Sequence, residues 1–86
     1  MKSIRLSAYA LSYIVKRGIA VAEVEETIAT MPWKAAEQGM NRPECSKEFP
    51  FNQYWNRRLY SIKQVRPIFV DDPLEILVVT VYTYYY

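Results

Sequence analysis

The chain has 86 residues and a mass of 10.2 kDa, which is enough for one small domain and too little for two. Apolar residues make up 51% of it, so wholesale disorder is excluded, and the net charge of +2 is well below that of a dedicated duplex-DNA binder. The absence of His, together with a single Cys, excludes a Cys–His catalytic pair, a soft-metal cluster and an internal disulfide.

The first residues lack the continuous apolar core of a signal peptide, because polar side chains interrupt them. No apolar run approaches the roughly 18–20 residues that span a bilayer. We therefore expect a cytoplasmic protein with no membrane contact.

Residues 3–17 are predicted to form a helix, with either Ser3 or Ser7 as its N-cap. Gly18 follows directly, as expected beyond a helix end, and two cations occupy the last turn. One apolar stripe on this helix is expected to pack on a sheet; it comprises Ala8, Leu11, Ile14 and Val15.

A second helix is predicted over Val21–Met31, where Pro32 stops it. Its first half is acidic, which suits the positive end of the helix dipole but repels phosphate. The helix pair is therefore not expected to read DNA.

The middle of the chain carries weaker signals. Trp33–Gln38 is predicted to be a short strand and Ala35–Cys45 a loop-rich segment. Lys47–Asn52 is predicted to be an edge strand or extended segment, because Pro50 lies within it.

Two long strands are predicted at the end of the chain, Arg57–Val70 and Leu74–Tyr84, joined by a turn at residues 71–73. In the second strand, Leu77, Val79 and Val81 are expected to face the helices. The predicted fold is α+β, a single domain over 1–86, with two N-terminal helices packed on one face of a small, mostly antiparallel four-stranded sheet.

Short motifs lie toward both ends of the chain: Tyr9-Ala10-Leu11, Arg17-Gly18-Ile19, Val24-Glu25 with Ile28, Lys63-Gln64-Val65, and Ile76 with Val78-Val79-Thr80-Val81-Tyr82. In these motifs the chain resembles a domain-of-unknown-function family that is grouped with the RelE/ParE and BrnT-type toxins of bacterial toxin–antitoxin systems. The resemblance implies a RelE-like fold with an RNA site on the open sheet face. It also implies a metal-independent, toxin-like RNA endoribonuclease that a cognate antitoxin neutralises.

Tyr9 stands where the family tends to carry His. The alternative hypothesis is therefore a catalytically inactive relative that acts as a protein-interaction or RNA-binding module.

Cleavage by 2′-OH attack needs an acid, a base and cations that stabilise the developing charge on the phosphate. With no His in the chain, the resemblance implies that Lys, Arg and Tyr fill these roles, without a metal or cofactor. The candidate catalytic residues are Lys63, Arg66 and Tyr82, and the candidate RNA-binding residues are Lys47, Arg57, Arg58, Tyr60 and Thr80.

Each candidate also has a structural interpretation. Lys63 and Arg66 line either a phosphate groove or a solvated strand face. Arg57-Arg58, beside Tyr54 and Trp55, either stack unpaired bases or form a hairpin tip. Thr80 either binds phosphate or pairs across strands. Lys16-Arg17 are interpreted as a charge pair at the end of the helix, with contact to a phosphate as the alternative.

The sequence ends in an unusual run of tyrosines. Tyr82, Tyr84 and Tyr86 are expected to share one face of the last strand, with Tyr85 on the other. Exposed aromatics at this density indicate an interface, either a stacking platform or an edge that docks a partner. The structural alternative is a frayed, amphipathic strand end. The expected partners are RNA, the antitoxin and a second copy of the chain bound through this strand.

Overall fold

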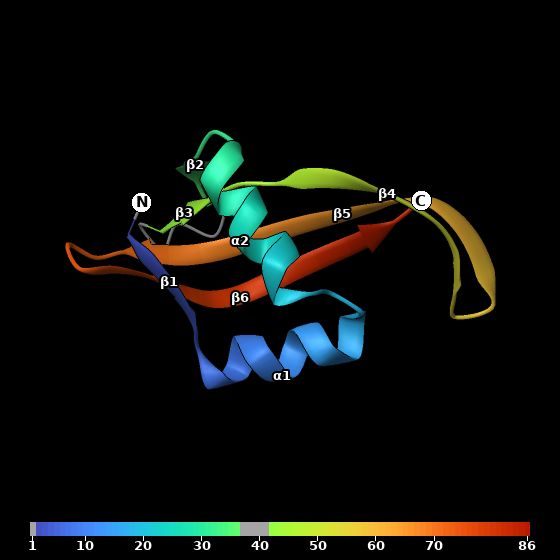
Figure 1. Cartoon of the computed structure of the whole chain (residues 1–86), viewed down its shortest axis with the longest axis horizontal. Helices are drawn as coiled ribbons and strands as arrows, with labels where there is room; N and C mark the ends of the chain where they lie inside the picture. Colours follow the sequence, from blue (N-terminus) through green and yellow to red (C-terminus); the bar gives the residue numbers. More distant parts are fainter. Residues whose placement is uncertain (1, 37–41) are drawn as a thin grey trace.

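The computed structural model describes residues 2–36 and 42–86 (Figure 1). The elements in chain order are β1 (Ser3–Leu6), α1 (Ala8–Arg17), α2 (Val21–Thr30), β2 (Lys34–Ala35), β3 (Pro43–Glu44), β4 (Lys47–Trp55), β5 (Arg58–Asp71) and β6 (Glu75–Tyr85).

Among these residues the strands form one mixed, six-stranded sheet in the order β1-β6-β5-β3-β2, and β4 pairs with a further stretch of β5. The β1–β6 pairing is parallel and the other pairings are antiparallel. The predicted four-stranded, mostly antiparallel sheet with helices on one face is therefore wrong in strand number and arrangement.

The first error lies at the N-terminus. Residues 3–6, predicted as the start of a helix, form β1, in which Ile4 pairs with Ile76 and Leu6 with Val78. Two apolar residues in alternation gain more from this pairing than from a first helical turn, because strand β6 offers them a buried neighbour.

Helix α1 begins only after this strand. The Ser7 hydroxyl accepts a hydrogen bond from the Ala10 amide, and Gly18 ends the helix in the left-handed conformation with φ 71°. Ser7 and the Gly18 stop are thus confirmed. The predicted apolar stripe is largely wrong: Ala10 and Ile14 are buried against β6, whereas Leu11 and Val15 are exposed.

Helix α2 is confirmed to within one residue. Val24, Thr27 and Ile28 are buried, and the helix contacts β5. The Glu23 carboxylate accepts a hydrogen bond from the Ala20 amide, so it caps the helix start in the way the acidic first half predicts.

The middle segment supplies the remaining strands. Part of the predicted loop Ala35–Cys45 is strand β3, where Glu44 pairs with both Ile68 and Lys34. Residues 37–41 of that loop, including the end of the predicted strand Trp33–Gln38, lie outside the described residues. The edge segment at Lys47–Asn52 is confirmed as part of β4.

The two long strands are confirmed, but a bulge changes which side chains of β6 face the helices. Ile68 pairs with Thr80 and Phe69 with Val78, so Val79 is an extra residue in the ladder. Ile76, Val78 and Val81 are buried as a result, while Leu77 and Val79 are only partly buried. The prediction is right for Val81 and wrong for the other two residues.

A single core holds the helices on the sheet. It joins Ala10 and Ile14 of α1 to Val24 and Ile28 of α2 and to the side chains of β5 and β6 on that face. We call this the helix-side face and the opposite one the outer face. No helix among the described residues has the length and apolar character needed to cross a membrane.

Candidate nucleic-acid interface

The positive side chains of this protein divide into two groups. Of the eleven Lys and Arg residues, six form ion pairs with described carboxylates. The other five form none among residues 2–36 and 42–86; they are Lys16, Arg17, Arg42, Arg57 and Arg58.

Four of these five cations lie at one end of the molecule, where the β4–β5 hairpin bends toward the end of α1 (Figure 1). Lys16 and Arg17 form the last turn of α1, and Arg57 and Arg58 lie at the hairpin tip. All four are exposed. We call these four residues the basic end.

An aromatic cluster joins the hairpin to the helix. Trp55, which pairs with Arg58, stacks on Tyr85 at a centroid distance of 5.1 Å and lies so close to Gly18 that a Cβ there would be 2.8 Å from the indole. The Tyr85 hydroxyl donates to the Arg17 carbonyl. Burial raises the pKa of the Tyr85 phenol, and Glu23 acts in the same direction. The neutral phenol is thus kept as a donor, which fixes the two parts of the basic end together.

The hairpin tip has an unusual backbone. Asn56 and Arg57 have φ values of 49° and 70°, as a tight two-residue turn requires. Gly is the preferred second residue of such a turn, so Arg57 is strained. Tyr54, next to the tip, is 73% exposed. The tip therefore presents cations beside an exposed ring.

Arg17 also lies against an aromatic ring. Its guanidinium is 4.5 Å from the centroid of Tyr13, and its Nη2 donates to the Tyr13 hydroxyl at 2.7 Å. The guanidinium is held in place without a carboxylate from the described ranges, so its charge stays available to an anion.

The three predicted catalytic residues do not converge. Lys63 lies on the helix-side face, 8% exposed, with its Nζ donating to Glu23 Oε1 at 2.8 Å and to the Gly18 carbonyl at 3.0 Å. Arg66 and Tyr82 pair across β5 and β6 on the outer face, where the guanidinium is 5.1 Å from the Tyr82 ring. Lys63 thus ties β5 to the link between α1 and α2. Of the three predicted catalytic residues, only Arg66 and Tyr82 lie next to each other.

The predicted RNA-binding residues also separate. Arg57 and Arg58 belong to the basic end. Lys47 pairs with Glu26 at 2.7 Å, and Tyr60 packs against Tyr85 within the aromatic cluster. Thr80 lies half-buried opposite Ile68, as its cross-strand interpretation predicts.

The terminal tyrosines alternate as predicted. Tyr82 and Tyr84 lie beside Arg66 on the outer face, and Tyr86 donates to Glu48. Tyr85 points to the helix-side face.

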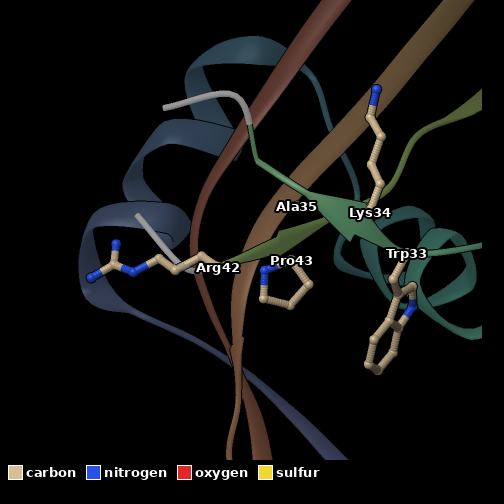
Figure 2. Close-up of a pocket in the computed structure, with 5 residues that line it drawn as sticks. All are labelled: Trp33, Lys34, Ala35, Arg42 and Pro43. Atoms are coloured by element: carbon tan, nitrogen blue, oxygen red, sulfur yellow. The ribbon is translucent and has the colours of Figure 1, made fainter. Parts of the chain in front are cut away.

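A shallow cavity of about 350 Å³ lies beside β2 and β3 (Figure 2). Trp33 and Pro43 extend toward the same side of this hairpin, while Lys34 and Arg42 point away from one another. The cavity therefore does not bring the charged groups of Lys34 and Arg42 together.

The described residues hold one free thiol, Cys45, which is buried. Burial, with a smaller effect of Glu44, raises the pKa of Cys45 to about 11, so the thiol is protonated at neutral pH. No group of three or more Cys, Asp or Glu side chains in the described ranges is arranged to hold a metal ion.

Sequence reasoning found the two halves of the basic end but did not join them, because the contact between Gly18 and Trp55 is long-range. One signal was present. The segments 3–22 and 49–70 contain no Asp or Glu, so cations there need partners from elsewhere in the chain.

Comparison with known proteins adds nothing to this geometry: no family model, curated protein or solved structure matches the chain.

Proposed function

We propose that the protein binds single-stranded RNA in the cytoplasm, with the basic end holding the sugar–phosphate chain. The observation that carries this proposal concerns the five cations that form no ion pair within residues 2–36 and 42–86. Four of them gather at one end, on α1 and on the β4–β5 hairpin, which are far apart in sequence. Phosphate neutralisation by Lys and Arg supplies most of the affinity in such binding.

A single strand fits this end better than a duplex. The exposed ring of Tyr54 can stack only on a base that is not enclosed in a helix. Four cations and a net charge of +2 are also few for a duplex binder, whereas they suit a short stretch of unpaired chain.

The experiment is a salt titration of binding to a labelled oligouridylate. The variants are the pairs Lys16→Ala/Arg17→Ala and Arg57→Ala/Arg58→Ala, and the matched control is Lys2→Ala/Arg5→Ala, which removes two cations that are paired with carboxylates. Each basic-end variant is expected to lower the slope of log K against log [salt] by about 0.7 for every phosphate that the variant no longer neutralises. The control should keep the wild-type slope, and an equal reduction in the control would refute the proposal.

Cleavage of the bound RNA and neutralisation by an antitoxin stay predictions. Because Lys63 is engaged on one face and Arg66 lies on the other, binding without cleavage is the function that the geometry supports best. Incubation of the same oligonucleotides with the protein in the absence of magnesium, followed by gel analysis, tests cleavage independently of binding.

A further inference from the structure

The outer face holds a buried carboxylate that accepts no hydrogen bond from the part of the chain that the structure describes. Glu44, on β3, is 2% exposed, and its Oε1 has no hydrogen-bonding partner among the described residues. The nearest cations are too far away for a hydrogen bond, because Lys34 Nζ is 4.0 Å from Oε1 and Arg66 Nε is 3.7 Å from Oε2. Such a carboxylate is unfavourable unless a donor reaches it.

Arg66 Nε is the matching donor, and it too forms no hydrogen bond within the described part of the chain. Two rings hold the guanidinium away from Glu44. Its Cζ is 5.1 Å from the Tyr82 centroid and 5.5 Å from the Tyr84 centroid, and its Nη2 donates to the Tyr84 hydroxyl at 3.1 Å. Arg66 therefore lies between the tyrosine rings and Glu44, and it forms a hydrogen bond only with Tyr84.

A guanidinium is planar and stacks on an aromatic face much as a nucleobase does. Arg66 thus occupies the place that a base would take on Tyr82 and Tyr84. A shift of about 1 Å toward Glu44 would bring Nε to the length of a charge-assisted hydrogen bond, about 2.7–2.9 Å. Arg66 Nε, which now lacks a partner, would then donate to Glu44 Oε2, and the buried carboxylate would gain a hydrogen bond.

We propose that Tyr82 and Tyr84 form a stacking site for a nucleobase, and that Arg66 leaves these rings for Glu44 when the base binds. This inference rests on the proposed function, since the RNA held at the basic end supplies the base. Tyr84 is 45% exposed and Tyr86, which follows on the same face, is 53% exposed, so a strand from the hairpin can reach the site along exposed rings.

The test compares two strands of equal length and charge, an oligouridylate and an abasic oligonucleotide. Tyr84→Ala removes a stacking ring and is expected to weaken oligouridylate binding about fivefold or more, the lower end for removal of one base–ring stack, without affecting the abasic strand. Leu74→Ala, which removes an exposed apolar side chain from the turn between β5 and β6, is the control and should change neither affinity.

The behaviour of Arg66 separates this proposal from simple phosphate binding. Arg66→Ala frees the rings, so oligouridylate affinity should stay equal or rise; a phosphate-gripping Arg66 would instead weaken binding of both strands. Glu44→Gln removes the charge that receives Arg66 and should weaken the oligouridylate alone. Thermal unfolding of each variant shows that the fold is retained.

The outcomes also distinguish the two proposals. If Tyr84→Ala weakens both strands equally or neither, the stacking site is refuted, while salt-dependent binding of the abasic strand still supports the basic end. If the wild type binds neither strand, the proposed function itself fails. Self-association that Tyr84→Ala abolishes would assign these rings to a second copy of the chain and would overturn the stacking site.

Discussion

The two ends of the β5–β6 strand pair differ in whether their cations form ion pairs. At the turn between these strands, Lys2 pairs with Asp71, and Arg5 holds Glu75 through two hydrogen bonds of 2.7 and 3.1 Å. At the basic end, four cations have no carboxylate partner among the described residues. Cations at the first end are neutralised within the fold, whereas those at the second leave their charge for another molecule.

Lys63 lies next to the basic end, yet it stabilises the fold, because its ammonium contacts Glu23 and the Gly18 carbonyl. Lys63→Met should lower the free energy of unfolding by about 3 kcal/mol, since it removes the cation that pairs with the largely buried Glu23 carboxylate and the ammonium that donates to the Gly18 carbonyl. Glu23 then keeps only the hydrogen bond from the Ala20 amide. Denaturant unfolding measures the change. Lys2→Met, at the paired and more exposed end, should cost at most about 1 kcal/mol. Equal costs would remove the distinction between the two cations.

Gly18→Ala is expected to have the next largest effect. The new Cβ would meet Trp55 at 2.8 Å and would occupy a left-handed backbone with φ 71°, so a destabilisation of about 1–2 kcal/mol is expected from the backbone alone. The indole must also move, which separates the hairpin from α1. RNA affinity should therefore fall although every cation is kept. An unchanged affinity would show that the two halves bind independently.

Arg57→Gly should change stability and binding in opposite directions. Glycine relieves the strain at φ 70°, so the free energy of unfolding should rise by about 0.5–1 kcal/mol, while the removal of one cation weakens RNA binding. Thermal unfolding and the salt titration measure the two effects. A less stable Arg57→Gly protein would contradict the view that this arginine is retained for binding.

The smallest effect concerns acid stability at the paired end. The hydrogen bond from Arg5 lowers the pKa of Glu75, so the ionised carboxylate favours the folded state. This contribution is complete above the ordinary Glu pKa of about 4.3 and is lost as pH falls through the lowered value. Glu75→Gln should therefore unfold with a slightly weaker dependence on acid pH than the wild type, by circular dichroism. An identical pH profile would mean that this ion pair contributes nothing.

Local signals predicted the parts of the fold that depend on neighbouring residues. Both helices, the glycine stop at Gly18 and the two long strands follow from short-range patterns. The sheet could not be predicted in the same way. Strand β1 pairs with residues about seventy positions away, and a bulge at Val79 changes which side chains face the helices in the first half of β6. Such pairing depends on contacts that no local pattern records.

The candidate site shows the same limit. Lys63 and Arg66 are three residues apart on one strand, so the period of two already separates them onto opposite faces, as the structure shows. The basic end, in contrast, depends on a contact between a helix terminus and a distant hairpin. Its residues could be named from the sequence, but their proximity could not.

The stacking of Trp55 between Gly18 and Tyr85 makes the molecule its own spectroscopic reporter. The chain has only one other indole, Trp33, which packs edge-on against Phe69. Replacing Trp33 with Phe would leave a single tryptophan at the junction of helix and hairpin. Its fluorescence would then follow any movement there, without an attached dye.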